Sequence, residues 1–96
     1  MNNTPKEVIS VSHNGSSLVP EEIVLQVGKN YEIQVTPTSN GIGCMFEATV
    51  PKLSNERWRI EAGKQFTIQV PNAQPGRYPV VCSAMGMQQG EIIVQS

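Results

Sequence analysis

The sequence lacks most of what an enzyme active site requires. It holds one histidine and two cysteines in 96 residues. A Ser/His/Asp set cannot be assembled around the single His13, which has no evident partner. Glu21, Glu22 and Glu47 show no paired spacing of the kind that supports acid–base catalysis. We therefore expect a protein that is not an enzyme.

The sequence also lacks an excess of charge of either sign and any long apolar run. The sequence has seven basic and eight acidic side chains. It therefore has no excess of positive charge with which to bind nucleic acid or anionic lipid. No stretch approaches the roughly 20 apolar residues of a membrane span, and the start "MNNTPKEV" has no apolar signal-peptide region. We expect a single domain over residues 1–96 that is a cytoplasmic monomer, binds no nucleic acid and does not insert into the membrane. It could stand alone or be the soluble domain of a membrane protein.

Helix signals are almost absent, and short runs of alternating apolar residues take their place. Clusters of Gly, Pro and Asn separate these runs about every eight to twelve residues, a spacing typical of β-sandwiches and barrels. Tyr31, Ile33 and Val35, for example, fall on one face of an expected strand. We predict an all-β protein, a Greek-key β-sandwich of seven or eight strands. The expected strands cover residues 7–13, 22–28, 31–37, 44–50, 77–82 and 91–95, with a strand pair around Gly63 within residues 57–70.

The segment "CSAMGMQQG", residues 82–90, concentrates sulfur in a short loop between two expected strands. It holds Cys82, Met85 and Met87, and Gly86 lets both thioethers turn back toward the thiol. Cu(I) is a soft ion that prefers thiolate and thioether donors. The other cysteine, Cys44, follows the loop-forming stretch "TPTSNGIG" and is the natural fourth donor. The four sulfurs could hold one Cu(I) ion, or a pair with the thiolates as bridges.

Structural roles compete with metal binding for these residue types. Met fills gaps in cores, and a buried Cys behaves as a small hydrophobic residue. Met85 and Met87, however, stand in a stretch without β alternation, where core residues are not expected. Met45 follows Cys44 in an expected strand and should pack in the core. His13, followed by "NGSS", is expected to be a solvated turn residue rather than a ligand.

The C-terminal stretch "PGRYPVVCSAMGMQQGEIIV" resembles the end of the cupredoxins, the β-sandwich family of copper proteins. In that family a Pro-Gly turn, an aromatic residue, a Cys ligand, a His ligand and a Met ligand follow one another. By resemblance, Cys82 takes the place of the Cys ligand, Met85 that of the second His and Met87 that of the axial Met. Cys44, after "SNGIG", takes the place of the first His.

Both family histidines are therefore missing, and imidazoles are what supports Cu(II) in a blue-copper site. The variant is similar to the Cu(I)-binding cupredoxin-like domains at the N-terminus of certain bacterial copper-exporting P-type ATPases and in related membrane-anchored copper chaperones. The resemblance implies a two-copper Cu(I) cluster, in which Cys44 and Cys82 bridge while Met85 and Met87 complete the shell. It also implies copper binding and transfer, with a copper-exporting ATPase or a copper chaperone as the partner.

Two alternative functions stay open. The order Cys44, Trp58, Cys82 mimics that of immunoglobulin-like interaction domains, in which the two cysteines would form a disulfide. Against this, Val80 stands where that fold places the tyrosine of its tyrosine corner. The other alternative is an electron-transfer cupredoxin with an unusual ligand set.

Overall fold

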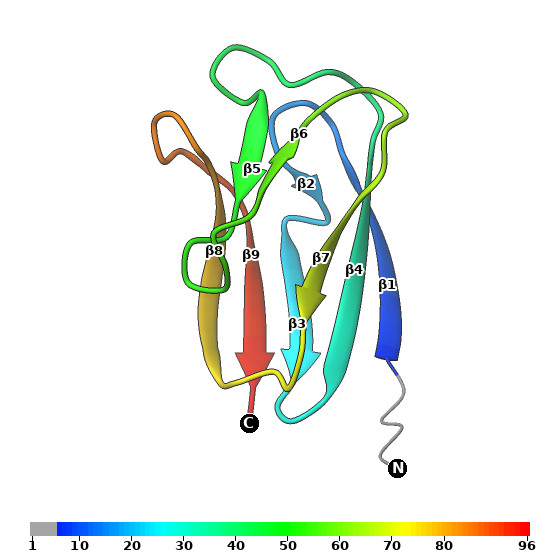
Figure 1. The fold of residues 1–96 in the computed structure, drawn as a ribbon, viewed down its shortest axis with the longest axis vertical. Helices are drawn as coiled ribbons and strands as arrows, with labels where there is room; N and C mark the ends of the chain where they lie inside the picture. The colour runs from blue at the N-terminus through cyan, green and yellow to red at the C-terminus, as the bar shows by residue number, and fades with distance from the viewer. Residues whose placement is uncertain (1–5) are drawn as a thin grey trace.

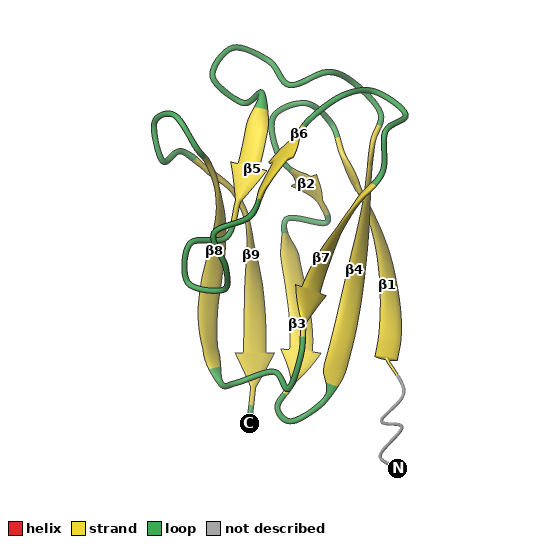
Figure 2. Ribbon diagram, viewed as in Figure 1, coloured by secondary structure: helices red, strands yellow, loops and turns green. Residues whose placement is uncertain are grey.

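Two β-sheets pack against each other to form the molecule. The computed structural model describes residues 6–96, and Figure 2 shows strands and loops but no helix in that part of the chain. One sheet has the strand order β2-β1-β4-β7 and the other the order β3-β9-β8-β5-β6, so the predicted all-β sandwich is confirmed. The strands are β1 (Lys6–His13), β2 (Leu18–Val19), β3 (Glu22–Gln26), β4 (Asn30–Pro37), β5 (Glu47–Thr49), β6 (Arg57–Arg59), β7 (Phe66–Val70), β8 (Gly76–Cys82) and β9 (Gln88–Gln95). The described residues form no helix that could cross a membrane.

The chain passes repeatedly from one sheet to the other (Figure 1). β1 and β4 run parallel along their whole length, from Lys6 opposite Asn30 to His13 opposite Pro37. β3 and β9 are also parallel, whereas the other strand pairs are antiparallel. Because parallel neighbours need a crossover connection, strands that are far apart in the sequence become neighbours within each sheet.

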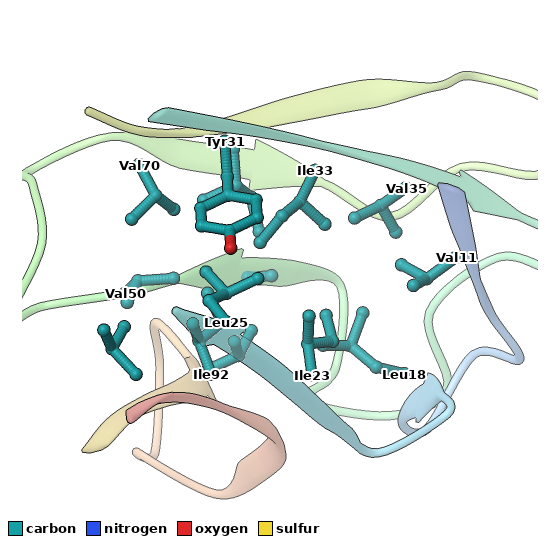
Figure 3. Packing of buried hydrophobic residues seen from close by; sticks show 14 of the residues in the cluster. Val11, Leu18, Ile23, Leu25, Tyr31, Ile33, Val35, Val50, Val70 and Ile92 are labelled. Atoms are coloured by element: carbon teal, nitrogen blue, oxygen red, sulfur yellow. The ribbon is translucent and has the colours of Figure 1, made fainter. Parts of the chain in front are cut away.

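The core lies between the sheets and consists of the inward faces of alternating strands. In β4, Tyr31, Ile33 and Val35 are buried and the residues between them are partly exposed, as the sequence pattern predicts. Leu25 and Ile92 meet them from the opposite sheet (Figure 3). Each fully buried side chain of this size stabilises the fold by about 1.5–3 kcal/mol relative to an exposed one.

The structure has nine strands, compared with the seven or eight that were predicted. The additional strand is β2, whose two residues Leu18 and Val19 pair with the end of β1. Two residues are too few to display an alternation of apolar and polar side chains, so no sequence pattern marks this strand.

The predicted strand pair around Gly63 is wrong. β6 and β7 flank Gly63, but β6 pairs with β5 whereas β7 pairs with β4 in the other sheet. The segment between them therefore carries the chain across the sandwich and does not form a hairpin. Alternation identifies a strand, but it does not identify the neighbour of that strand.

Three local predictions near the candidate ligands also need correction. The strand predicted from Cys44 onward begins only at Glu47, so Cys44 and Met45 lie in the turn before β5. Met45 is consequently only partly buried and is not a core residue. His13 is fully buried and not solvated, because β1 extends to this residue and turns its side chain inward.

The loops that carry the sulfur atoms lie at one end of the sandwich. The β4–β5 loop, residues 38–46, and the β8–β9 loop, residues 83–87, both lie at the end opposite the C-terminus (Figure 1). The fold thus gathers at one rim the two segments that hold Cys44 and the methionines, while the core fills the space below them.

The core predicts a large difference between inward and outward apolar residues. Ile33→Ala removes most of a fully buried side chain and should lower the free energy of unfolding by about 2–5 kcal/mol. Val24→Ala, at a position that is 53% exposed, should change it by less than about 0.5 kcal/mol. Urea unfolding monitored by circular dichroism measures both values. Equal losses of stability in the two variants would contradict this assignment of the core.

Candidate metal centre

Residues 38–46 connect β4 to β5 and hold Cys44 in a tight fold-back. The Gly41 N–H donates to the Ile60 carbonyl at 3.0 Å, and the Met45 N–H donates to the Ile42 carbonyl at 3.0 Å. A Cβ atom at position 41 would collide with the Met45 carbonyl, so only glycine allows the backbone to approach this closely. The fold-back brings Cys44 against the β8–β9 loop.

The β8–β9 loop wraps around the sulfur of Cys82, the last residue of β8. The Cys82 N–H donates to the Met87 carbonyl at 2.8 Å and closes the loop. Gly86, with φ of 69°, supplies the left-handed residue that this turn requires. The backbone N–H groups of Met85 and Met87 both point at the Cys82 Sγ, each at 3.4 Å. The loop therefore orients backbone donors toward a thiolate.

Three of the four predicted ligands have sulfur atoms in contact. The Cys44 Sγ lies 3.8 Å from the Cys82 Sγ and 3.7 Å from the Met87 Sδ. Metal–sulfur bonds of about 2.3 Å place two sulfurs that share a tetrahedral ion about 3.8 Å apart. The observed spacing therefore fits one metal ion shared between thiols and thioether. Both cysteines are free, so the disulfide that an immunoglobulin-like domain would contain is not formed.

Burial divides the four sulfur residues into an inner and an outer group. Cys82 is 1% exposed and Cys44 is half-buried, whereas Met87 is 51% and Met85 72% exposed. Met85 contributes its backbone N–H to Cys82 while its side chain extends into solvent. A ligand entering from solvent therefore meets the thioethers first and the Cys82 thiol last.

The two thiols differ in acidity. Burial by itself raises the pKa of Cys82, but hydrogen bonds from the N–H groups of Met85 and Met87 and from Cys44 outweigh it and bring this pKa below its ordinary value. The pKa of Cys44 is raised, first by its hydrogen bond to Cys82 and then by burial and by the charge on Cys82. Cys82 is thus the thiol that ionises first, and Cys44 holds the remaining proton.

Sequence reasoning missed a set of buried and partly buried polar residues near the sulfurs. The His13 Nε2 and the Gln89 Oε1 lie 2.9 Å apart, and the Ser83 hydroxyl donates to the Glu47 carboxylate at 2.7 Å. These partners are 76 and 36 residues apart in the chain, so no local pattern marks them. Within residues 6–96, no three groups drawn from His, Cys, Asp and Glu gather closely enough to hold a metal ion. The donors that converge are sulfurs.

A family model described as "Cupredoxin-like domain" matches residues 2–94. The chain belongs to the cupredoxin-like domain family. Its two-sheet, all-β architecture is the one that the resemblance of its C-terminal stretch implies. Among curated protein sequences, none matches it.

Solved structures with the same fold include copper proteins. An NMR structure of a copper binding protein in the apo form is 22% identical, with a TM-score of 0.73, and the match covers 99% of this chain and 92% of that one. The metal binding domain of the Streptococcus pneumoniae Cu(I) exporting P-type ATPase CopA, solved with Cu(I), is 22% identical, with a TM-score of 0.75 and coverage of 100% and 91%. An oxidised mutant of amicyanin is 13% identical, with a TM-score of 0.59, and the match covers 92% of this chain and 82% of that one. These structures share the fold of this chain, and the first two are described as binding copper.

The unequal acidity of the thiols predicts two separate ionisation steps in the metal-free protein. Thiolate absorption in the ultraviolet, followed as the pH rises, should show Cys82 ionising below the ordinary range of cysteine and Cys44 above it. Cys82→Ala removes both the hydrogen bond and the charge that raise the pKa of Cys44, so the remaining step should move to lower pH. A single step that accounts for both thiols in the unmodified protein would contradict this assignment.

Proposed function

We propose that this domain binds Cu(I) through Cys44, Cys82, Met85 and Met87 and passes it to a partner protein. The observation that carries the proposal is the convergence of unbonded sulfurs. Two free thiols that are 38 residues apart in the chain lie 3.8 Å from each other, with the Met87 thioether 3.7 Å from Cys44. Soft thiolate and thioether donors favour Cu(I) over ions that prefer oxygen or nitrogen.

The state of the single histidine supports Cu(I) over a redox-cycling copper site. A blue-copper centre uses imidazole ligands to support Cu(II). His13 is fully buried, its Nδ1 accepts the Gly15 N–H at 3.0 Å, and its Nε2 is hydrogen-bonded to Gln89. Neither ring nitrogen is available as a ligand, which argues against the electron-transfer alternative.

The proposed cluster holds two Cu(I) ions bridged by the thiolates of Cys44 and Cys82. Its support is the spacing of the two thiols together with the thioethers on the same loop. Met87 already touches Cys44, and the unbranched side chain of Met85 is free to turn back toward Cys82, around which its backbone is folded. In this arrangement each copper ion has both thiolates and one thioether as ligands.

Transfer to a partner follows from the exposure of the donors. A thiolate from a partner protein can approach the ions from the side of the exposed methionines, Met85 and Met87. A neutral thioether is the weaker ligand and leaves first, so the copper ion moves without ever being free in solution. No substrate is transformed, and the domain acts as a carrier rather than an enzyme. The cytoplasm suits this role because it keeps thiols reduced.

The proposed partner is a copper-exporting ATPase or a copper chaperone, with this domain either separate or part of the transporter. The similarity in fold to the metal binding domain of a Cu(I) exporting ATPase supports this choice, since the match covers 91% of that domain. A copper chaperone could exchange copper in the same way, because the exposed thioethers of Met85 and Met87 in this domain are accessible to either partner.

Anaerobic copper titration tests the ligand set. Competition with a colorimetric Cu(I) chelator should give two ions per chain for the unmodified protein. Cys82→Ser removes a bridging thiolate and should weaken Cu(I) binding by more than about 100-fold, since even partners outside the ligand shell change metal affinity by about 10–100-fold. Met87→Leu keeps the shape but removes one thioether, and should weaken binding by only about tenfold. Undiminished Cu(I) affinity in Cys82→Ser would overturn the proposal.

The close backbone approach at Gly41 gives a second test. Gly41→Ala pushes the new methyl group into the Met45 carbonyl and should displace Cys44, so Cu(I) affinity falls by about tenfold or more. Gly28→Ala is the control for lost stability, because Gly28 has a positive φ of 83° that strains an alanine, but it has open space around it and lies far from the sulfurs. Both variants should lose stability in urea unfolding. Equal copper affinities in the two variants would show that the fold-back does not position Cys44.

A further inference from the structure

His13 and Gln89 form a buried polar pair between β1 and β9. The Gly15 N–H donates to the His13 Nδ1 at 3.0 Å, so this nitrogen is an acceptor and the ring proton lies on Nε2. Nε2 then donates to the Gln89 Oε1 at 2.9 Å, and the Gln89 amide nitrogen donates to the Glu47 carbonyl at 3.0 Å. The three hydrogen bonds run in one direction and connect β1, β9 and β5.

The His13–Gln89 pair is connected to both ends of the β4–β5 loop, residues 38–46, which we call the Cys44 loop. The His13 carbonyl accepts the N–H of Thr38, the first residue of the loop, at 2.9 Å. The Glu47 carbonyl, which Gln89 binds, belongs to the first residue after the loop. Between these points the Gly15 carbonyl accepts the Ile42 N–H at 2.9 Å. The segment that holds Cys44 is therefore fixed at its start, middle and end by His13 and its neighbours.

The His13–Gln89 pair is connected equally closely to the β8–β9 loop, which carries Met85 and Met87. Gln89 lies two residues after Met87, and it reaches the interior only because β9 contains a β-bulge there. Val80 pairs with Gly90 and Val81 pairs with Gln88, which leaves Gln89 as the extra residue. A bulge shifts the alternation of a strand and re-aims a side chain. Gln89, only 1% exposed, is thus directed inward toward His13.

Core packing alone does not require polar side chains at positions 13 and 89. Two apolar side chains could fill the same space, whereas buried polar groups must be hydrogen-bonded to avoid a large penalty. Burial lowers the pKa of His13 by more than the hydrogen bond to Gln89 raises it, so the ring is neutral at neutral pH. A neutral ring keeps Nδ1 as an acceptor and Nε2–H as a donor, which is the pattern that its two partners require.

We infer that the His13–Gln89 hydrogen bond is a positioning device, which fixes the Cys44 loop and the Met87 end of the β8–β9 loop at the separation that the copper cluster needs. This inference rests on the proposed function for its purpose, but the ordering of the loops can be observed without copper. His13 is a positioning residue and does not touch the metal. Ligands held at their bound separation before the metal arrives need not be ordered during binding.

A matched pair of substitutions separates the two hydrogen bonds of the His13 ring. His13→Gln is long enough to present an amide N–H to Gln89, whereas His13→Asn can accept only the Gly15 N–H. The turn after β1 tolerates either change, because it is also closed by the Asn14 N–H donating to the Ser17 carbonyl. Val70→Ala serves as a control for lost stability, since Val70 is buried in β7 at the far end of the core (Figure 3).

The rate of Cu(I) transfer from loaded protein to an excess of chelator is the first measurement. His13→Asn should release copper about tenfold faster than the unmodified protein, in the range seen when partners outside a ligand shell are lost. His13→Gln and Val70→Ala should stay within about threefold of it. Amide hydrogen exchange in the metal-free protein is the second measurement, and only His13→Asn should speed exchange at the Met45 and Met87 N–H groups, by about tenfold.

The outcomes distinguish this inference from the function on which it rests. Identical copper release and identical exchange in His13→Asn and His13→Gln would overturn the positioning role, even with normal copper binding. Equal acceleration in Val70→Ala would also overturn it, since general loss of stability would then explain the effect. If the unmodified protein binds no Cu(I), the proposed function fails, and the exchange measurement alone decides whether the pair orders the loops.

Discussion

The antiparallel pairing of β5 with β8 places the two cysteines beside each other. In such a pair the start of one strand lies next to the end of its neighbour. Cys82 is the last residue of β8 and lies opposite Ala48, whereas Cys44 stands three residues before β5 begins. Two residues distant in the chain therefore meet without a long loop. Because a slip of one residue would turn Cys82 to the other face of the sheet, the sulfur spacing depends on the strand register.

The sequence allowed the strands to be predicted, and it pointed to the sulfur-bearing residues that the fold brings together, but it did not reveal which strands pair. Alternation marked Tyr31, Ile33 and Val35 as one inward face, since this pattern is local. Donor softness marked the cysteines and methionines, because it is a property of single residue types. The pairing on either side of Gly63 and the burial of His13 depend on contacts between distant segments. No local pattern encodes them, and both predictions were wrong.

The candidate metal centre combines a buried thiol that has a lowered pKa with exposed thioether side chains. Cys82 is almost inaccessible to solvent, yet the N–H groups of Met85 and Met87 keep its thiolate stable. Such burial would be costly without those donors. The same holds for the neighbouring polar residues, since no buried side-chain nitrogen or oxygen in the described part of the chain lacks a hydrogen-bond partner. His13 and Gln89, the buried polar side chains of the described residues, are both satisfied in this way.

The β-bulge at Gln89 changes which residues of β9 point inward on either side of it. Beyond it, Ile92 and Val94 continue inward in the phase that the sandwich requires. If the extra residue were removed while residues 83–88 stayed in place, β9 would shift by one residue and these two side chains would rotate out of the core. The bulge therefore lets Gln88, beside the methionines, stay exposed while Ile92 and Val94 stay buried. One inserted residue thus reconciles the backbone course of the β8–β9 loop with the alternation of the hydrophobic interior.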